Sequence, residues 1–251
     1  MLKAALFGFI AGSALLIGAI LGLYLHIGRR TLATIMAFGA GVLICTLSFD
    51  LMEDAYRRGG FDSVTIGFLT GAVLFVFGDW LVDRHGGHYR KGTHSSRHLA
   101  RHPEHGESSG MAIFIGALLD GIPESAIIGV GLLAEQNLGV TMLVAVFLSN
   151  LPEGVSGAYG MAETGRSKAS IMYLWTATAL VCALSSALGY RLLGNSPKDV
   201  IAFALAFAAG AILAMVTDTM IPEAFENEGK IAALATVAGF MVSFVVSRLA
   251  K

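Results

Sequence analysis

The sequence predicts an all-α integral membrane protein with eight transmembrane helices. Two observations lead to this class: an apolar composition, and apolar runs of membrane-spanning length separated by short polar joints. Hydrophobic residues make up 55% of the 251 residues, charged residues 14%, and the mean hydropathy is +0.70. A helix that crosses the hydrocarbon core needs about 20 mostly apolar residues. We therefore expect one transmembrane domain over residues 1–251, embedded in the lipid bilayer, with no separate soluble domain.

The first apolar run begins after Lys3 and continues to Tyr24 without a clear A-x-A cleavage signature, so we interpret it as a retained helix. Cys45 and Cys182 fall inside apolar runs, where a buried thiol usually behaves as a small hydrophobic side chain. The net charge of -1 gives no basic surface, and we expect no nucleic-acid partner. The predicted spans are residues 4–25, 32–54, 64–82, 111–133, 139–161, 170–192, 200–222 and 231–249.

Basic residues favour one orientation of these spans. Eight helices put both termini on the same side, and with the termini outside, the inner joints hold ten of the 17 Lys and Arg residues. By the positive-inside rule, this predicts external termini in a cell (inner) membrane. The inner residues are Arg29, Arg30, Arg84, Arg90, Lys91, Arg97, Arg101, Arg166, Lys168 and Lys230.

Two distant segments resemble each other at a constant offset, which maps Ala37 onto Ala206. AFGAGVLICTLSFDLMEDAY from Ala37 matches AFAAGAILAMVTDTMIPEAF from Ala206 without a gap, and Asp54 then corresponds to Glu223. The second and seventh helices cross in opposite directions, so the similarity predicts an inverted repeat, which is common in secondary transporters. Three helices at each end leave the fourth and fifth as a central pair, a 3+2+3 arrangement.

The central pair carries two related motifs, DGIPES at residues 120–125 and SNLPEG at 149–154. When the two motifs are aligned without a gap, Pro123 and Glu124 correspond to Pro152 and Glu153. Each motif is near the middle of its span, hence near the bilayer midplane. We expect each proline ring to kink its helix and to leave a backbone carbonyl without its usual donor.

Acidic side chains at this depth require a partner. Asp120, Glu124 and Glu153 together would cost on the order of 9 kcal/mol if they faced lipid. Residues four apart share a helix face, so two facing helices can bring oxygen-bearing side chains to one cation. The candidate metal ligands are Asp120, Glu124, Ser149, Asn150 and Glu153. Protonated acids that only hydrogen-bond between helices are the simpler alternative.

Further acids mark candidate ends of an ion pathway. Asp50, Glu53 and Asp54 close the second helix, and Asp218 and Glu223 are near the inner end of the seventh. Acids hydrated at the headgroup level are the alternative interpretation.

Six of the seven histidines fall in the loop at residues 83–110, which we expect in the cytoplasm as a weak metal buffer or sensor. A soluble linker whose basic residues fix the orientation is the alternative. The histidines are His85, His88, His94, His98, His102 and His105.

With these spans, the paired P-E motifs and the histidine loop, the chain resembles the ZIP family of divalent metal transporters over nearly its whole length. The resemblance implies a 3+2+3 fold, external termini, frequent homodimers, and transport of zinc, cadmium, iron or manganese toward the cytosol. It also implies that Glu124 and Glu153 bind the transported metal. Asp120 stands where the family usually has His, Ser149 replaces His or Gln, and Asn150 occupies a position that can carry an acid for a second metal position.

These departures bear on metal choice. Imidazole suits zinc, whereas an all-oxygen site favours harder ions such as manganese, magnesium or iron(II). Zinc is therefore expected from the resemblance but not from the ligand chemistry. The sixth helix offers no acid, so we expect a depleted or missing second metal position. The metal is a transported substrate, and no cofactor is expected.

Two other functions remain open: a proton- or sodium-coupled transporter of another substrate, and a metal-sensing membrane protein. We expect no enzyme activity, because the spans hold no HExxH, no G-x-G-D and no Ser/His pair. The inverted repeat predicts alternating access. No GxxxxGK[ST] motif occurs, so we expect the metal gradient or intracellular chelation to drive transport.

Overall fold

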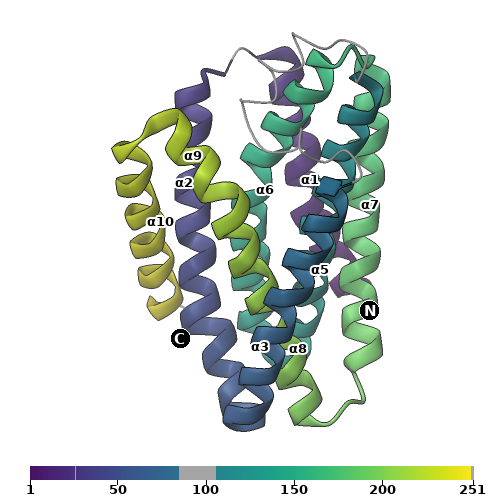
Figure 1. The fold of residues 1–251 in the computed structure, drawn as a ribbon. Coiled ribbons are helices and arrows are strands. Elements are labelled where there is room, and N and C mark those ends of the chain that lie inside the picture. The colour runs from purple at the N-terminus through teal and green to yellow at the C-terminus, as the bar shows by residue number, and fades with distance from the viewer. Residues whose placement is uncertain (26, 85–105, 250–251) are drawn as a thin grey trace.

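The computed structural model describes residues 1–25, 27–84 and 106–249, which form a bundle of long helices (Figure 1). The all-helical architecture predicted from the sequence is confirmed for these residues. Seven helical stretches among them are long and apolar enough to cross a membrane. In chain order the elements are α1 (Leu2–Tyr24), α2 (Arg29–Thr46), η1 (Leu47–Leu51), α3 (Met52–Arg84), α5 (Gly106–Ala134), α6 (Gln136–Glu163), α7 (Lys168–Leu193), α8 (Lys198–Met215), η4 (Val216–Met220), α9 (Ile221–Glu228) and α10 (Lys230–Leu249).

One of the seven stretches, Arg29–Leu81, is 53 residues long and contains a break. Gly60 inside α3 has φ 69° and ψ −170°, a backbone conformation that only glycine adopts readily. A straight helix of this length would reach about 80 Å, well beyond a hydrocarbon core of about 30 Å. Figure 1 shows the chain turning back where α2 passes into α3. The turn falls in the joint expected between residues 54 and 64.

Two segments have π-helical rather than α-helical hydrogen bonding, which the sequence did not lead us to expect. They are η1 after α2 and η4 after α8, and they begin at Leu47 and Val216, which are equivalent positions in the two repeated segments. Each contains one of the predicted pathway acids, Asp50 in η1 and Asp218 in η4. Short π-helical turns inside helices are frequent at functional sites.

The two central helices continue through their prolines. Pro123 lies inside α5, which has 29 residues, and Pro152 lies inside α6, which has 28. Each ring removes one backbone donor from its helix. The kink expected from the sequence therefore does not interrupt either helix.

Glycines let pairs of helices approach until their backbones touch. A side chain at Gly41 would collide with the backbone of α10, and one at Gly210 with the backbone of α3. These two glycines occupy equivalent positions in the repeated segments. The partner helices contribute glycines too: Gly71 of α3 lies against the backbone of α8, and Gly239 of α10 lies against the backbone of α2. Because lipid is as apolar as the helix surfaces, close packing of this kind is a main source of helix association in membranes.

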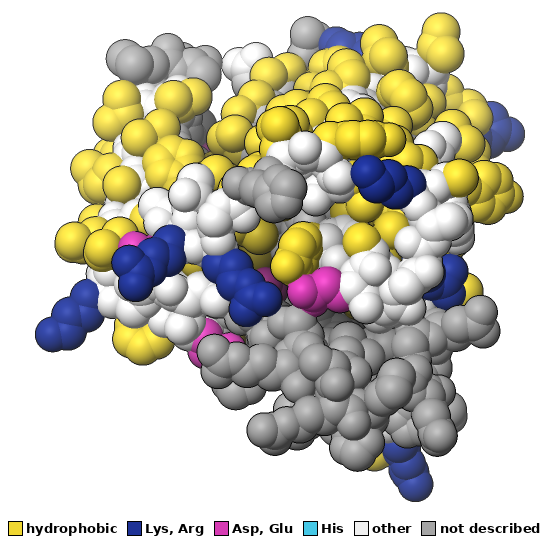
Figure 2. All heavy atoms as spheres, turned by 90° about the horizontal axis from the view of Figure 1, so that it is seen from above, with side chains coloured by type: hydrophobic (Ala, Val, Ile, Leu, Met, Phe, Trp, Pro, Cys, Tyr) yellow, Lys and Arg dark blue, Asp and Glu magenta, His cyan; other side chains and the backbone are white. Residues whose placement is uncertain are grey.

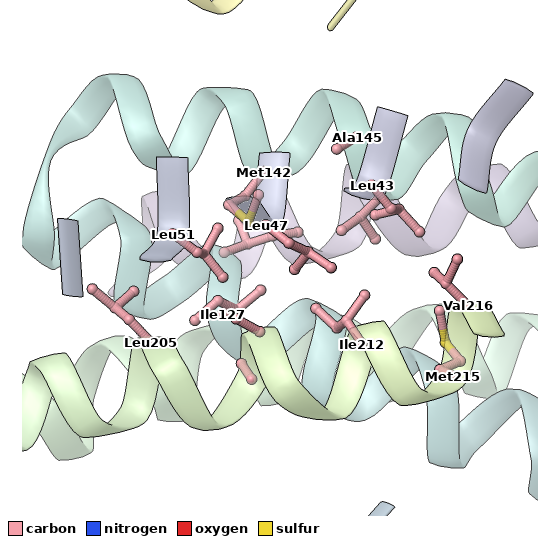
Figure 3. Packing of buried hydrophobic residues seen from close by; sticks show 14 of the residues in the cluster. Leu43, Leu47, Leu51, Ile127, Met142, Ala145, Leu205, Ile212, Met215 and Val216 are labelled. Carbon is pink, nitrogen blue, oxygen red and sulfur yellow. The ribbon is translucent and has the colours of Figure 1, made fainter. Parts of the chain in front are cut away.

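A buried apolar cluster fills the space between α2, α5, α6 and α8. Figure 3 shows Leu47 of η1, Ile127 of α5, Met142 of α6 and Ile212 of α8 pointing toward one another. Each of the four is at most 3% exposed. The cluster lies on the α5 and α6 segments that follow and precede the P-E motifs, respectively.

Basic side chains gather at one end of the bundle. Figure 2 looks onto this end and shows Lys and Arg side chains there, with hydrophobic side chains around the flanks. Arg29, Arg30, Lys168 and Lys230 are exposed at the helix starts on this end. The charge bias predicts that this end faces the cytosol, which stays a prediction.

Candidate metal site between helices α5 and α6

Two acidic residues in the middle of α5 are buried. Asp120 and Glu124 are one helical turn apart, and their exposed fractions are 7% and 1%. Among the residues that the structure describes, neither carboxylate oxygen of Glu124 has a hydrogen-bond partner. A buried, unpaired carboxylate is costly, so such a group normally binds a proton, a water molecule or a cation.

Ser149 and Asn150 of α6 are also buried, and hydrogen bonds hold both side chains in place. The Ser149 hydroxyl donates to the carbonyl of Val146 at 3.0 Å, within its own helix. The Asn150 amide nitrogen donates to the carbonyl of Ala11 on α1 at 3.1 Å, which ties α6 to α1. The amide oxygen of Asn150 has no hydrogen-bond partner within the described part of the chain, and Glu153 is half-buried.

The three carboxylates lie near one another across the two helices. Glu153 and Asp120 are both ionisable neighbours of the Glu124 carboxylate. Within residues 1–25, 27–84 and 106–249, however, no group of three or more His, Cys, Asp or Glu side chains is close enough to hold a metal ion. Side-chain rotation would be needed for these groups to converge on a single ion.

An acidic pocket of about 300 Å³ opens at the end of the bundle where α5 passes into α6. The predicted acids Asp50, Glu53 and Asp54 all line it. Ser247 of α10 donates to Asp50 at 2.7 Å. Sequence reasoning missed Glu135, because it was placed in a loop with no sign that it faces the second helix. The lining residues are Asp50, Glu53, Asp54, Arg57, Glu135, Asn137, Leu138, Thr141 and Ser247.

One arginine bridges two of the helices beside this pocket. Arg58 pairs with Asp54 at 2.6 Å and donates to the carbonyl of Ala134 at 2.6 Å. Ala134 is the last residue of α5, where helix carbonyls lack intrahelical donors. Arg58 therefore joins the start of α3 to the end of α5.

The remaining predicted pathway acids lie farther along the bundle. Glu223 of α9 accepts a hydrogen bond from Ser156 of α6 at 3.1 Å. Ser156 follows Glu153 by three residues, so it stands on the next turn of the same helix. The sequence offered a signal for it, since SxxxE and ExxS spacings around Glu153 place Ser149, Glu153 and Ser156 near one face. The six histidines of the predicted metal loop lie outside the described residues.

No protein-family model matches the chain. The chain is 25% identical, over 242 residues, to a protein of Arabidopsis thaliana named "Putative zinc transporter". This similarity covers 93% of the chain but only 37% of the length of that relative. Together with the long apolar helices, it identifies a multi-pass membrane protein distantly related to a protein named as a transporter.

Proposed function

We propose that the protein carries divalent metal ions across a membrane, with zinc as the first candidate, and that Asp120, Glu124 and Glu153 bind the ion in transit. The observation that carries this proposal is the state of Glu124. Its carboxylate is 1% exposed, both oxygens lack a partner, and two further acids act on it. A divalent cation between α5 and α6 would compensate two of the three negative charges that Asp120, Glu124 and Glu153 carry when ionised.

The order of side chains along α6 supports a route past this site. Thr141 lines the acidic pocket, and Glu153 lies twelve residues later, about 18 Å along the helix. Ser156 and its hydrogen bond to Glu223 lie on the far side of Glu153. The pocket would collect cations from one side, and Glu223 would stand on the route to the other.

Between the pocket and the site lies an apolar barrier. On α6, Met142, Ala145 and Val146 separate Thr141 from Ser149, and each is at most 1% exposed. On α5, Ile127 and Ile128 separate Glu124 from Glu135, and they are equally buried. An apolar layer of this kind blocks a hydrated ion. Under alternating access, it must open for ions to pass from the pocket to the carboxylates.

We further propose eight crossings in a 3+2+3 inverted repeat of the ZIP type. The break at Gly60 supports counting Arg29–Leu81 as two crossings. The repeat is supported by two features that recur at equivalent positions of the two matching segments: the π-helical segments η1 and η4, and the close backbone contacts of Gly41 and Gly210.

The test is metal uptake by proteoliposomes that contain the full chain and a metal-responsive dye. Wild type is compared with Glu124→Ala and Glu153→Ala for zinc, cadmium, manganese, iron(II) and magnesium. We expect both substitutions to abolish uptake. Glu163→Ala is the matched control, because Glu163 is exposed at the end of α6 and should leave uptake unchanged.

A folded wild-type protein that moves none of these ions would contradict the carrier proposal. The two other functions predicted from the sequence would then take its place. Proton or sodium fluxes through the same liposomes would identify a coupled transporter, whereas metal binding without flux would identify a sensor.

A further inference from the structure

Cys182 lies beside the turn of α5 that carries the acids. It is 1% exposed on α7, and its thiol donates to the carbonyl of Gly121 at a sulfur-to-oxygen distance of 3.8 Å. Gly121 stands between Asp120 and Glu124, and a Cβ at this position would be 3.3 Å from the sulfur. The glycine thus leaves room for the thiol at the level of the acidic turn.

Further contacts join the thiol to the candidate site. The side chain of Ser125, the residue after Glu124, lies next to the thiol of Cys182. Glu124 and Glu153 are both ionisable neighbours of this thiol. Independently of the cysteine, Glu124 has two partnerless oxygens in the same buried region. Three helices, α5, α6 and α7, therefore each contribute one potential metal-binding group to this region. Among the described residues no three such groups are close enough to hold an ion together, so binding would require the side chains to rotate toward it.

We propose that Cys182 supplies a sulfur ligand to the divalent ion bound by Glu124 and Glu153, and that this ligand gives the site a preference for thiophilic ions. Thiolate ligands favour zinc and cadmium, whereas a purely carboxylate site favours harder ions such as manganese. The proposal rests on the proposed function, since it concerns the same site. The proposal places a metal ligand on α7, the sixth predicted span, in which the sequence showed no acidic residue.

Binding through sulfur needs the thiolate, so the Sγ proton passes to water as the metal–sulfur bond forms. The thiol must also leave its contact with the Gly121 carbonyl. A thiol is only a weak hydrogen-bond donor, so this contact is easily replaced. The metal takes its place as the partner of the sulfur.

The other cysteine provides a matched control. Cys45 is fully buried on α2, where it lies next to Ser243 of α10. The purified full chain is compared with Cys182→Ser and Cys45→Ser. Two signals are recorded: the ultraviolet charge-transfer absorption of a cadmium–thiolate bond, and the ratio of cadmium to manganese uptake into proteoliposomes.

We expect wild type and Cys45→Ser to show the charge-transfer band, and Cys182→Ser to lack it. We expect Cys182→Ser to lower the cadmium-to-manganese uptake ratio about tenfold, the scale on which metal-site substitutions act. A Cys182→Ser protein that keeps both the band and the ratio overturns the proposal. Continued manganese uptake by this variant would show that the carrier function itself stands.

A second measurement covers the case in which Cys182→Ser does not fold. In wild type, alkylation of the two cysteines by a small maleimide is followed by mass spectrometry with and without cadmium. We expect cadmium to slow alkylation of Cys182 and not of Cys45. Equal rates for Cys182 in both conditions, in protein that binds cadmium, would contradict the sulfur ligand.

Discussion

The two P-E turns have similar sequences but different surroundings. On α5, Glu124 is fully buried and both of its oxygens lack partners. On α6, Glu153 is half-buried, and its neighbours Ser149 and Asn150 are hydrogen-bonded within the helix and to α1. The two similar motifs therefore differ in role: the α5 turn holds a buried acid without a hydrogen-bond partner among the described residues, and the α6 turn is anchored to the rest of the bundle.

The largest expected effect is on transport, where the two glutamates should differ. We expect Glu124→Gln to lower the rate of metal uptake about 100-fold and Glu153→Gln about tenfold, within the range known for residues at metal sites. The amide keeps the size of each side chain and removes its charge. Initial uptake rates in proteoliposomes measure both values. Equal losses would show that the two turns are equivalent and that the comparison is wrong.

The next effect is on stability, where replacing Glu124 should be favourable although it impairs transport. Glu124→Leu should raise the free energy of unfolding of the metal-free protein by about 1–3 kcal/mol, because it removes a buried group without partners. Glu153→Leu should change it by less, because Glu153 is half-buried. Reversible unfolding in mixed detergent micelles measures both variants. If Glu124→Leu destabilises the protein, Glu124 must already have a favourable partner.

The smallest effect concerns the anchoring of α6. Asn150→Leu removes the hydrogen bond to the Ala11 carbonyl and should lower the free energy of unfolding by about 1 kcal/mol. Ser149→Ala should lower it by only a few tenths of a kcal/mol, because that hydroxyl bonds within its own helix. The same unfolding assay compares them. A larger loss of unfolding free energy for Ser149→Ala than for Asn150→Leu would show that Ser149, and not Asn150, anchors α6.

Local patterns were sufficient to predict the helices and the burial of the site. Apolar runs and polar joints predicted an all-helical fold of long apolar helices, and the described residues form seven such stretches where eight spans were predicted. The energetic cost of midplane acids predicted that Glu124 would be buried. The turn at Gly60 could be placed because charged residues and two glycines interrupt the run there.

Contacts between distant segments could not be predicted in this way. The position of Cys182 beside Gly121 depends on the rotation of α7 against α5, which an apolar helix pattern does not determine. The hydrogen bond from Ser156 to Glu223 likewise depends on how the helices are rotated against one another. The same is true of the position of Glu135 in the acidic pocket. The π-helical segments depend on one extra residue being accommodated in a turn, which leaves no mark in hydropathy.

The glycine contacts between helix backbones limit how the molecule can move. Where Gly41 and Gly239 join α2 to α10, and Gly71 and Gly210 join α3 to α8, no side chains intervene that could change rotamer and absorb a displacement. Each pair of helices consequently moves as one rigid body. Large relative motions of the helices must then occur at interfaces that are packed through side chains. The buried apolar cluster around Met142 and Ile127 is such an interface.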